Sequence, residues 1–93
     1  MSTIEHRPDQ HRFVAALEGG RGEVTYRLDG DVMTILHTQV DPSLEGQGVA
    51  GRLVQAALDH ARAQGLRVDP VCGYANKYMQ RHPDTQALRA RPA

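Results

Sequence analysis

Three glycines lie close together in the middle of the chain, at Gly46, Gly48 and Gly51. They fall between a strand-like segment that ends at Val40 and a long segment with helical apolar spacing. Glycine has no Cβ atom, so a ligand can approach its main chain closely. The first amides of a helix have no internal acceptor, and the helix dipole adds partial positive charge there. The stretch therefore indicates either an ordinary loop before a helix or an anion site made of backbone amides.

The pattern of the loop narrows the kind of anion. It lacks the Lys-Ser/Thr pair that completes a nucleotide P-loop, which argues against hydrolysis of ATP or GTP. The dinucleotide fingerprint does not fit either, because the preceding segments predict a meander and the glycine spacing differs. The remaining candidate is a binding loop for a pyrophosphate that begins at Gly46. Arg52, one turn into the helix, would add positive charge. The expected donors of the loop are the backbone amides of Gln47, Gly48, Val49, Ala50 and Gly51.

Length and charge limit the classes of partner. The chain has 93 residues, enough for one domain, which we assign to residues 1–93. A domain of this size buries only roughly 60 % of its unfolded surface, so we expect ligands in a surface groove. Eleven basic and eleven acidic side chains balance, and only one Phe and three Tyr are present. We therefore expect neither a nucleic-acid partner nor a membrane partner.

Cysteine usage and the N-terminal residues suggest a compartment. Cys72 is the single cysteine, so the chain cannot form an internal disulfide. Residues 1–9 are polar and lack the apolar stretch of a secretory signal. No apolar run approaches the roughly 20 residues that cross a bilayer. We expect a cytoplasmic protein.

Hydrophobic periodicity predicts an α+β fold in the order β-β-β-α-β-α. Alternation and turn residues predict three antiparallel strands at 11–17, 23–28 and 32–40, after a loose polar lead-in over 1–10. The third strand is apolar on both faces for much of its length, which favours a central position covered on both sides. A helix is expected at 47–64, a parallel strand at 66–72 and a short helix at 76–81. Residues 84–91 are expected to form a second short helix or a frayed tail.

Two groups of residues together resemble a known family. Val40-Asp41-Pro42 followed by Glu45-Gly46-Gln47-Gly48-Val49-Ala50 is similar to the acetyl-CoA motif of the GNAT superfamily of N-acetyltransferases. Glu45 departs from that motif, which has Arg or Gln at this position. His37-Thr38-x-Val40, Pro70-x-Cys72-x-Tyr74 and His82-Pro83 resemble a minimal, single-domain subgroup of the superfamily. The resemblance covers about residues 10–85.

The resemblance implies a cosubstrate and where it binds. The cosubstrate is acetyl-CoA, with its diphosphate on the loop amides and its pantetheine arm along the segment that contains Thr38 and Val40. The arm separates the third strand from the strand after the helix, so the thioester lies between Val40 and Cys72. Asn76 and Tyr78 on the short helix become candidate contacts of the arm.

Two residues are candidates for the chemistry of acyl transfer. Cys72 could form an acyl-cysteine intermediate or protonate the departing CoA sulfur; alternatively, it is a small buried residue. His37 is expected on the face of the strand that carries Met33 and Ile35, either as a general base or as a core histidine bonded to backbone. Larger relatives often use a glutamate on this strand, and the strand has none. Tyr74 and Tyr78 could supply a proton or pack over the core.

These observations lead to one leading hypothesis and two rivals. We expect an N-acetyltransferase that moves acetyl from acetyl-CoA to an amine acceptor, by direct attack or through Cys72. The rivals are a non-catalytic module that binds acetyl-CoA or CoA, and an interaction domain that binds neither. The five histidines are scattered without ligand spacing, so we expect no metal. The sequence leaves the acceptor and the oligomeric state open.

Overall fold

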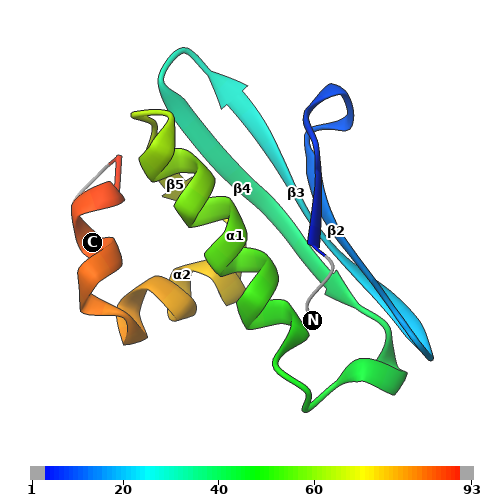
Figure 1. Ribbon diagram of the computed structural model, residues 1–93. Coiled ribbons are helices and arrows are strands. Elements are labelled where there is room, and N and C mark those ends of the chain that lie inside the picture. Colours follow the sequence, from blue (N-terminus) through cyan, green and yellow to red (C-terminus); the bar gives the residue numbers. More distant parts are fainter. Residues whose placement is uncertain (1–3, 91–93) are drawn as a thin grey trace.

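The computed structural model describes residues 4–90 and contains one five-stranded sheet with helices on one side (Figure 1). The strands lie in chain order; the first four are antiparallel and the last pair is parallel. The fold class is confirmed. The elements are β1 (Ile4–Arg7), β2 (Arg12–Leu17), β3 (Gly20–Asp29), β4 (Val32–Val40), α1 (Val49–Ala63), β5 (Arg67–Pro70) and α2 (Gly73–Arg81), with 3₁₀ turns at Pro8–Gln10, Pro42–Leu44 and Pro83–Leu88.

The N-terminal segment was predicted wrongly as a loose lead-in. Ile4–Arg7 forms β1 and pairs with β2, with Ile4 opposite Ala15 and Arg7 opposite Arg12. Four residues are too few to show a period, so the sequence carries no clear strand signal there. The turn after β1 ends at His11, which has a left-handed φ of 53° and is therefore not the first residue of β2. The part of the prediction that covers residues 1–3 lies outside the described residues.

The later boundaries differ by a few residues from those predicted. Helix α1 begins at Val49, because residues 45–48 form turns instead of helix. Helix α2 begins at Gly73, three residues earlier than expected. The segment predicted as a second helix or tail is the 3₁₀ turn Pro83–Leu88, and position 91 lies outside the described residues.

The core lies between α1 and one face of the sheet. The apolar stripe of α1 is buried, and Leu53, Val54 and Ala57 are fully inaccessible. Burying a side chain such as leucine contributes about 1.5–3 kcal/mol. Gly22 on β3 makes close packing possible, since a Cβ there would come within 3.1 Å of both Leu53 and Val40. Helix α1 is thereby fixed over the ends of β3 and β4.

A β-bulge in β4 corrects the prediction for His37. Tyr26 pairs with Ile35 while Thr25 pairs with His37, so Leu36 is an extra residue in β4. Met33 and Ile35 are fully buried under α1, whereas His37 lies on the opposite face and is exposed. Strand β4 lies inside the sheet between β3 and β5, but its outer face is uncovered at Leu36, which is 40 % exposed. The expectation that His37 shares a face with Met33 and Ile35 is therefore wrong.

Strands β4 and β5 separate soon after they pair. Their register ends with Ile35 opposite Pro70, and the last contact is the amide of Cys72, which donates to the Ile35 carbonyl at 3.0 Å. Pro70 cannot donate to a ladder, and the chain turns into α2 directly after Cys72. Beyond Ile35, β4 is paired with β3 alone. One edge of its last residues is therefore left open.

A ring cluster fastens β1 to the core. The His6 ring stacks on Phe13 with centroids 4.1 Å apart, and its Nε2 lies 2.6 Å from the Tyr26 hydroxyl. The His60 ring of α1 lies 4.3 Å from His6. Burial lowers the pKa of His6 below its ordinary value, and the neighbouring His60 imidazole lowers it further. The fold thus favours neutral His6.

We predict that acid destabilises the protein through His6. The unfolded chain takes up a proton near the ordinary histidine pKa of about 6.5, whereas the folded chain takes it up only at lower pH. Stability is therefore complete above about pH 6.5 and falls until the pH passes the folded pKa of His6. Thermal unfolding should show a midpoint that drops between pH 7.5 and 5.5. His6→Phe keeps the stack on Phe13 and should flatten this slope, whereas an unchanged slope would contradict the assignment.

Candidate functional site

A groove of about 1020 Å³ runs from the glycine loop to the far side of the sheet. One end is lined by Glu45, Gly46, Gly48, Val49 and Ala50. Its middle follows the open end of β4, Thr38 to Val40, with Tyr74 of α2 beside it. Its other end is lined by side chains of β2 and β3. The groove thus joins the loop to the last residues of β4; Cys72 is not among its lining residues.

The loop presents backbone amides at the start of α1. Gly46 and Gly48 have φ values of 86° and 75°, and a Cβ at either would meet nothing, so glycine is needed for conformation and not for space. Gly48 caps α1 without a side-chain hydrogen bond, and the first turn has no acidic residue. The first helical bond runs from the Arg52 amide to the Gly48 carbonyl, at 3.1 Å. The amides of Val49, Ala50 and Gly51 precede that bond and are free to bind an anion.

Two other predicted loop residues have structural partners. The Gln47 amide, expected to bind phosphate, donates to the Leu44 carbonyl at 3.2 Å and is therefore already used. The Arg52 guanidinium donates to the Gln47 carbonyl at 3.3 Å. This contact holds Arg52 against the loop, close to the free amides.

The tyrosines of α2 take different positions. A Cβ on Gly51 would lie 3.4 Å from the Tyr74 hydroxyl and 3.6 Å from the Tyr78 ring, so α2 packs closely on the first turn of α1. Tyr74 lines the groove and is 44 % exposed. Tyr78 donates to the Gln55 amide oxygen and stacks on His82, and burial, with smaller contributions from nearby charges, raises its pKa. Tyr78 therefore packs, and Tyr74 is the one of the two that lines the groove.

Asn76, a candidate contact of the arm, has a hydrogen-bond partner outside the groove. Its amide oxygen accepts a bond of 3.0 Å from the Arg89 guanidinium, which joins α2 to the segment after Leu88. It is not among the residues that line the groove. The half-buried Asn76 is thus used to hold the C-terminal segment.

Cys72 and Thr38 bridge the gap between the separated strands. Cys72 is at the N-cap of α2, half-buried, and its Sγ lies 3.4 Å from the Thr38 hydroxyl oxygen. Burial alone would raise the pKa of the thiol. The Thr38 hydroxyl and backbone groups of Ala75, Tyr74 and Thr38 outweigh burial, so the pKa of Cys72 lies below its ordinary value. A helix N-terminus favours thiolate in the same way.

His37 is not brought together with Cys72. It is exposed on the outer face of the sheet, opposite Thr25, and does not line the groove.

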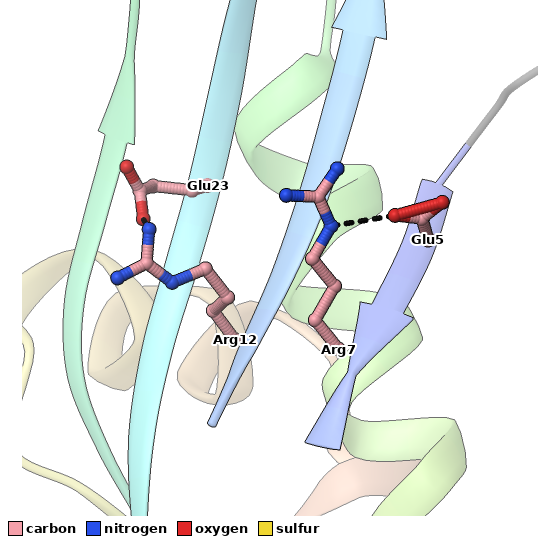
Figure 2. Close-up of polar contacts among 4 residues, drawn as sticks. All are labelled: Glu5, Arg7, Arg12 and Glu23. Carbon is pink, nitrogen blue, oxygen red and sulfur yellow. Dashed lines mark hydrogen bonds and ion pairs between the residues drawn. The ribbon is translucent and has the colours of Figure 1, made fainter. Parts of the chain in front are cut away.

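A charged pair at the far end of the groove was missed. Arg12 Nη1 lies 2.9 Å from Glu23 Oε2 (Figure 2). Glu23 is the cross-strand neighbour of Gln39 on β4. In larger relatives a carboxylate is expected on the strand equivalent to 32–40, whereas Glu23 is in the preceding strand, β3. Only the register of β3 against β4 places Glu23 beside the groove.

Residues 4–90 were compared with the requirements of a membrane-spanning helix and of a metal site. The helices there lack the length and apolar character needed to cross a membrane. The same residues contain no group of three or more His, Cys, Asp or Glu side chains that could hold a metal ion.

Sequence comparison gives a consistent match. The model of the GCN5-related N-acetyltransferase family matches residues 12–88. The protein NATD1 of Gallus gallus is 31 % identical over 88 residues, which cover 91 % of this chain and 80 % of that protein. Human NATD1 is also 31 % identical, and the match covers 91 % of this chain and 78 % of its length.

Solved structures have the same fold. The solution structure of a GCN5-like protein from Staphylococcus aureus matches with a TM-score of 0.75 at 26 % identity, covering 98 % of this chain and 90 % of that chain. An acetyltransferase from Trypanosoma brucei matches with a TM-score of 0.52 at 16 % identity, covering 81 % and 63 %. The second similarity concerns the fold alone.

We predict that Thr38 controls the acidity of Cys72. Thr38→Val removes the hydroxyl that stabilises the thiolate and should raise the pKa of Cys72, slowing alkylation by iodoacetamide near neutral pH. Because Cys72 is the single cysteine, the pH profile of alkylation reports on it alone. Thr25→Val, on the adjacent strand opposite His37, is the matched control and should leave the profile unchanged. Equal profiles for the two variants would contradict the role of Thr38.

Proposed function

The chain belongs to the GCN5-related N-acetyltransferase family, and from this premise we propose that it transfers an acetyl group from acetyl-CoA to an amine. The observation that carries the proposal is the groove that joins free helix amides to the open edge of β4. The diphosphate of CoA needs the free helix amides, and the acyl-pantetheine arm needs the open edge of β4.

The start of α1 suits the diphosphate of CoA. Backbone amides of Val49, Ala50 and Gly51 can donate to its oxygens, and Gly48 leaves the main chain accessible. Arg52 adds positive charge near these amides, and the first turn of α1 has no acidic residue to oppose the anion. Two carboxylates of the connection between β4 and α1, Asp41 and Glu45, line the same groove. We assign binding to the amides, not to these side chains.

The open edge of β4 suits the pantetheine arm. The amide groups of the arm can hydrogen-bond to the main chain of Thr38 to Val40 as an added strand would. In this position the thioester would lie near Cys72 and Tyr74, at the end of the separated strands. Fixing the arm on a rigid strand also orients the carbonyl for attack.

The reaction needs a neutral amine and a proton for the leaving thiolate. Aliphatic amines such as lysine have a pKa of about 10.4, so the acceptor must lose a proton before it attacks. We propose direct attack on the thioester carbonyl, after which the carbon–sulfur bond breaks and the CoA thiolate takes a proton. The Tyr74 hydroxyl is the donor that faces the groove. Cys72, whose pKa is lowered, is the candidate nucleophile of the alternative two-step route.

A second function is favoured by one specific observation. Strand β4 has no glutamate, and its histidine, His37, lies away from the groove. A module that binds acetyl-CoA or CoA without catalysis would need neither residue. Release of free CoA that depends on an added amine would exclude this second function.

We predict that a negative charge introduced at position 48 weakens the binding of CoA. Gly48→Glu puts a carboxylate beside the proposed diphosphate and should weaken binding by about 100-fold or more, or about 2.7 kcal/mol. Gly30→Glu is the matched control, since Gly30 also has a positive φ and open space around it, in the β3–β4 turn. Both variants carry similar backbone strain and the same charge. Calorimetric titration with CoA should separate them, and equal affinities would contradict the loop assignment.

We predict that Cys72 is not acetylated during turnover. Mixing the protein with acetyl-CoA alone, quenching within one turnover time and measuring intact mass should show the unmodified chain. Cys72→Ala should still transfer acetyl to an amine. An acetyl group on Cys72 that forms and is discharged to the amine at the rate of turnover would establish the two-step route instead.

A further inference from the structure

We propose that the Glu23–Arg12 pair is the acceptor subsite, and that the acceptor is a free α-amino acid. This inference rests on the proposed acetyl transfer and specifies its second substrate. The two residues line the groove together with Thr38, Gln39 and Val40 of β4. They face away from α1, which passes behind the strands in Figure 2. An acceptor can therefore approach from the face of the sheet that the helices leave open.

Glu23 is the group suited to the amine. It is the cross-strand neighbour of Gln39, which lies in the β4 segment assigned to the pantetheine arm. Its side chain is 26 % exposed, so the carboxylate is accessible but partly shielded. A carboxylate at this position attracts an ammonium ion and can then accept its proton.

Arg12 is the group suited to a carboxylate. It is bound to Glu23 through Nη1, while its Nε is buried and has no hydrogen-bond partner within residues 4–90. A buried donor without a partner is costly, and a planar guanidinium matches a carboxylate through two parallel bonds. A ligand carboxylate could satisfy this donor when an ammonium ion takes the place of Arg12 on Glu23.

The neighbouring charges determine which way round the ammonium and carboxylate groups of the acceptor bind. Arg7 is the cross-strand partner of Arg12 and lies on the same face, held by Glu5 through a 2.5 Å contact with Nε (Figure 2). Moving away from β4, the charges are therefore negative at Glu23 and positive at Arg12, followed by the Arg7–Glu5 ion pair. An amine beside the thioester with a carboxylate directly behind it fits this order. Because Glu23 and Arg12 touch, the two groups of the ligand must be close, as in an α-amino acid.

The transfer is balanced in this arrangement. The bound ammonium gives one proton to Glu23, and the neutral amine attacks the thioester carbonyl carbon. The carbon–sulfur bond breaks, and the leaving CoA thiolate takes a proton from the Tyr74 hydroxyl, which is restored by the second proton of the nitrogen. The products are an N-acetyl amino acid and CoA, and Glu23 returns its proton to water.

The test compares acceptors that differ only in the carboxylate. Each of the twenty common amino acids is assayed against its carboxamide, whose less basic amine should otherwise react more readily. We expect the best amino acid to exceed its carboxamide in kcat/KM by about tenfold or more, as charged hydrogen bonds allow. Arg12→Gln should remove this preference by raising KM, Arg12→Lys should restore part of it, and Glu23→Gln should lower kcat.

Arg27→Gln is the matched control. Arg27 is also paired with an acid on β3, Asp29, at 3.5 Å, but it does not line the groove. This variant should keep both the activity and the preference. If carboxamides react as well as amino acids with the wild-type protein, the inference is wrong while the proposed acetyl transfer stands.

If no amine is acetylated, the amino-acid subsite can still be tested by measuring binding. That outcome would overturn the proposed function, and the subsite is then tested by NMR titration of the CoA complex with the same amino acids. Shifts at Arg12 and Glu23 that disappear in Arg12→Gln would support an amino-acid site. No shifts at these residues would overturn it.

Discussion

The separation of β4 from β5 after Ile35 is the constraint on which the site depends. Parallel strands usually pair along their length, and here pairing stops because β5 is short, ends in Pro70 and runs directly into α2. The separation leaves one edge of β4 unpaired and brings Cys72 to the start of a helix. An unpaired edge normally invites association with another chain. In the proposed complex the cosubstrate occupies this edge, so the same feature serves as a binding site.

Helix α1 links the two ends of the cosubstrate site. Its first turn supplies the free amides, and Leu53, one turn further, packs over Gly22 and Val40 at the end of β4. Gly51 lets α2 approach, so Tyr74 lies beside the loop and the open strand at once. A shift of α1 would therefore move the phosphate site and the arm site together. In a small domain with a limited core, this shared support replaces the deep pocket that a larger protein could build.

The sequence was sufficient to predict features that depend on local patterns. It was insufficient to predict features that depend on how the strands align with one another. Apolar spacing identified α1, and the glycines identified the loop at its start. A single bulged residue, Leu36, reversed the face of His37, because side chains alternate with a period of two. Strand β1 was too short to show a period. The Glu23–Arg12 pair requires the alignment of three strands, which no local pattern contains.

The two ends of the groove use different kinds of charge, and this difference fits their tasks. The loop end offers backbone dipoles, which are fixed by the helix and suit a ligand part that is the same in every cycle. The sheet end offers side-chain charges, which can exchange partners when a second substrate arrives and leaves. In the free protein Arg12 is ion-paired with Glu23, so the carboxylate is not left without a partner before the acceptor binds. An acceptor that provides only a cation would leave Arg12 without its anion. An acceptor that carries both charges leaves neither group unpaired, and on this ground a zwitterion is the better fit.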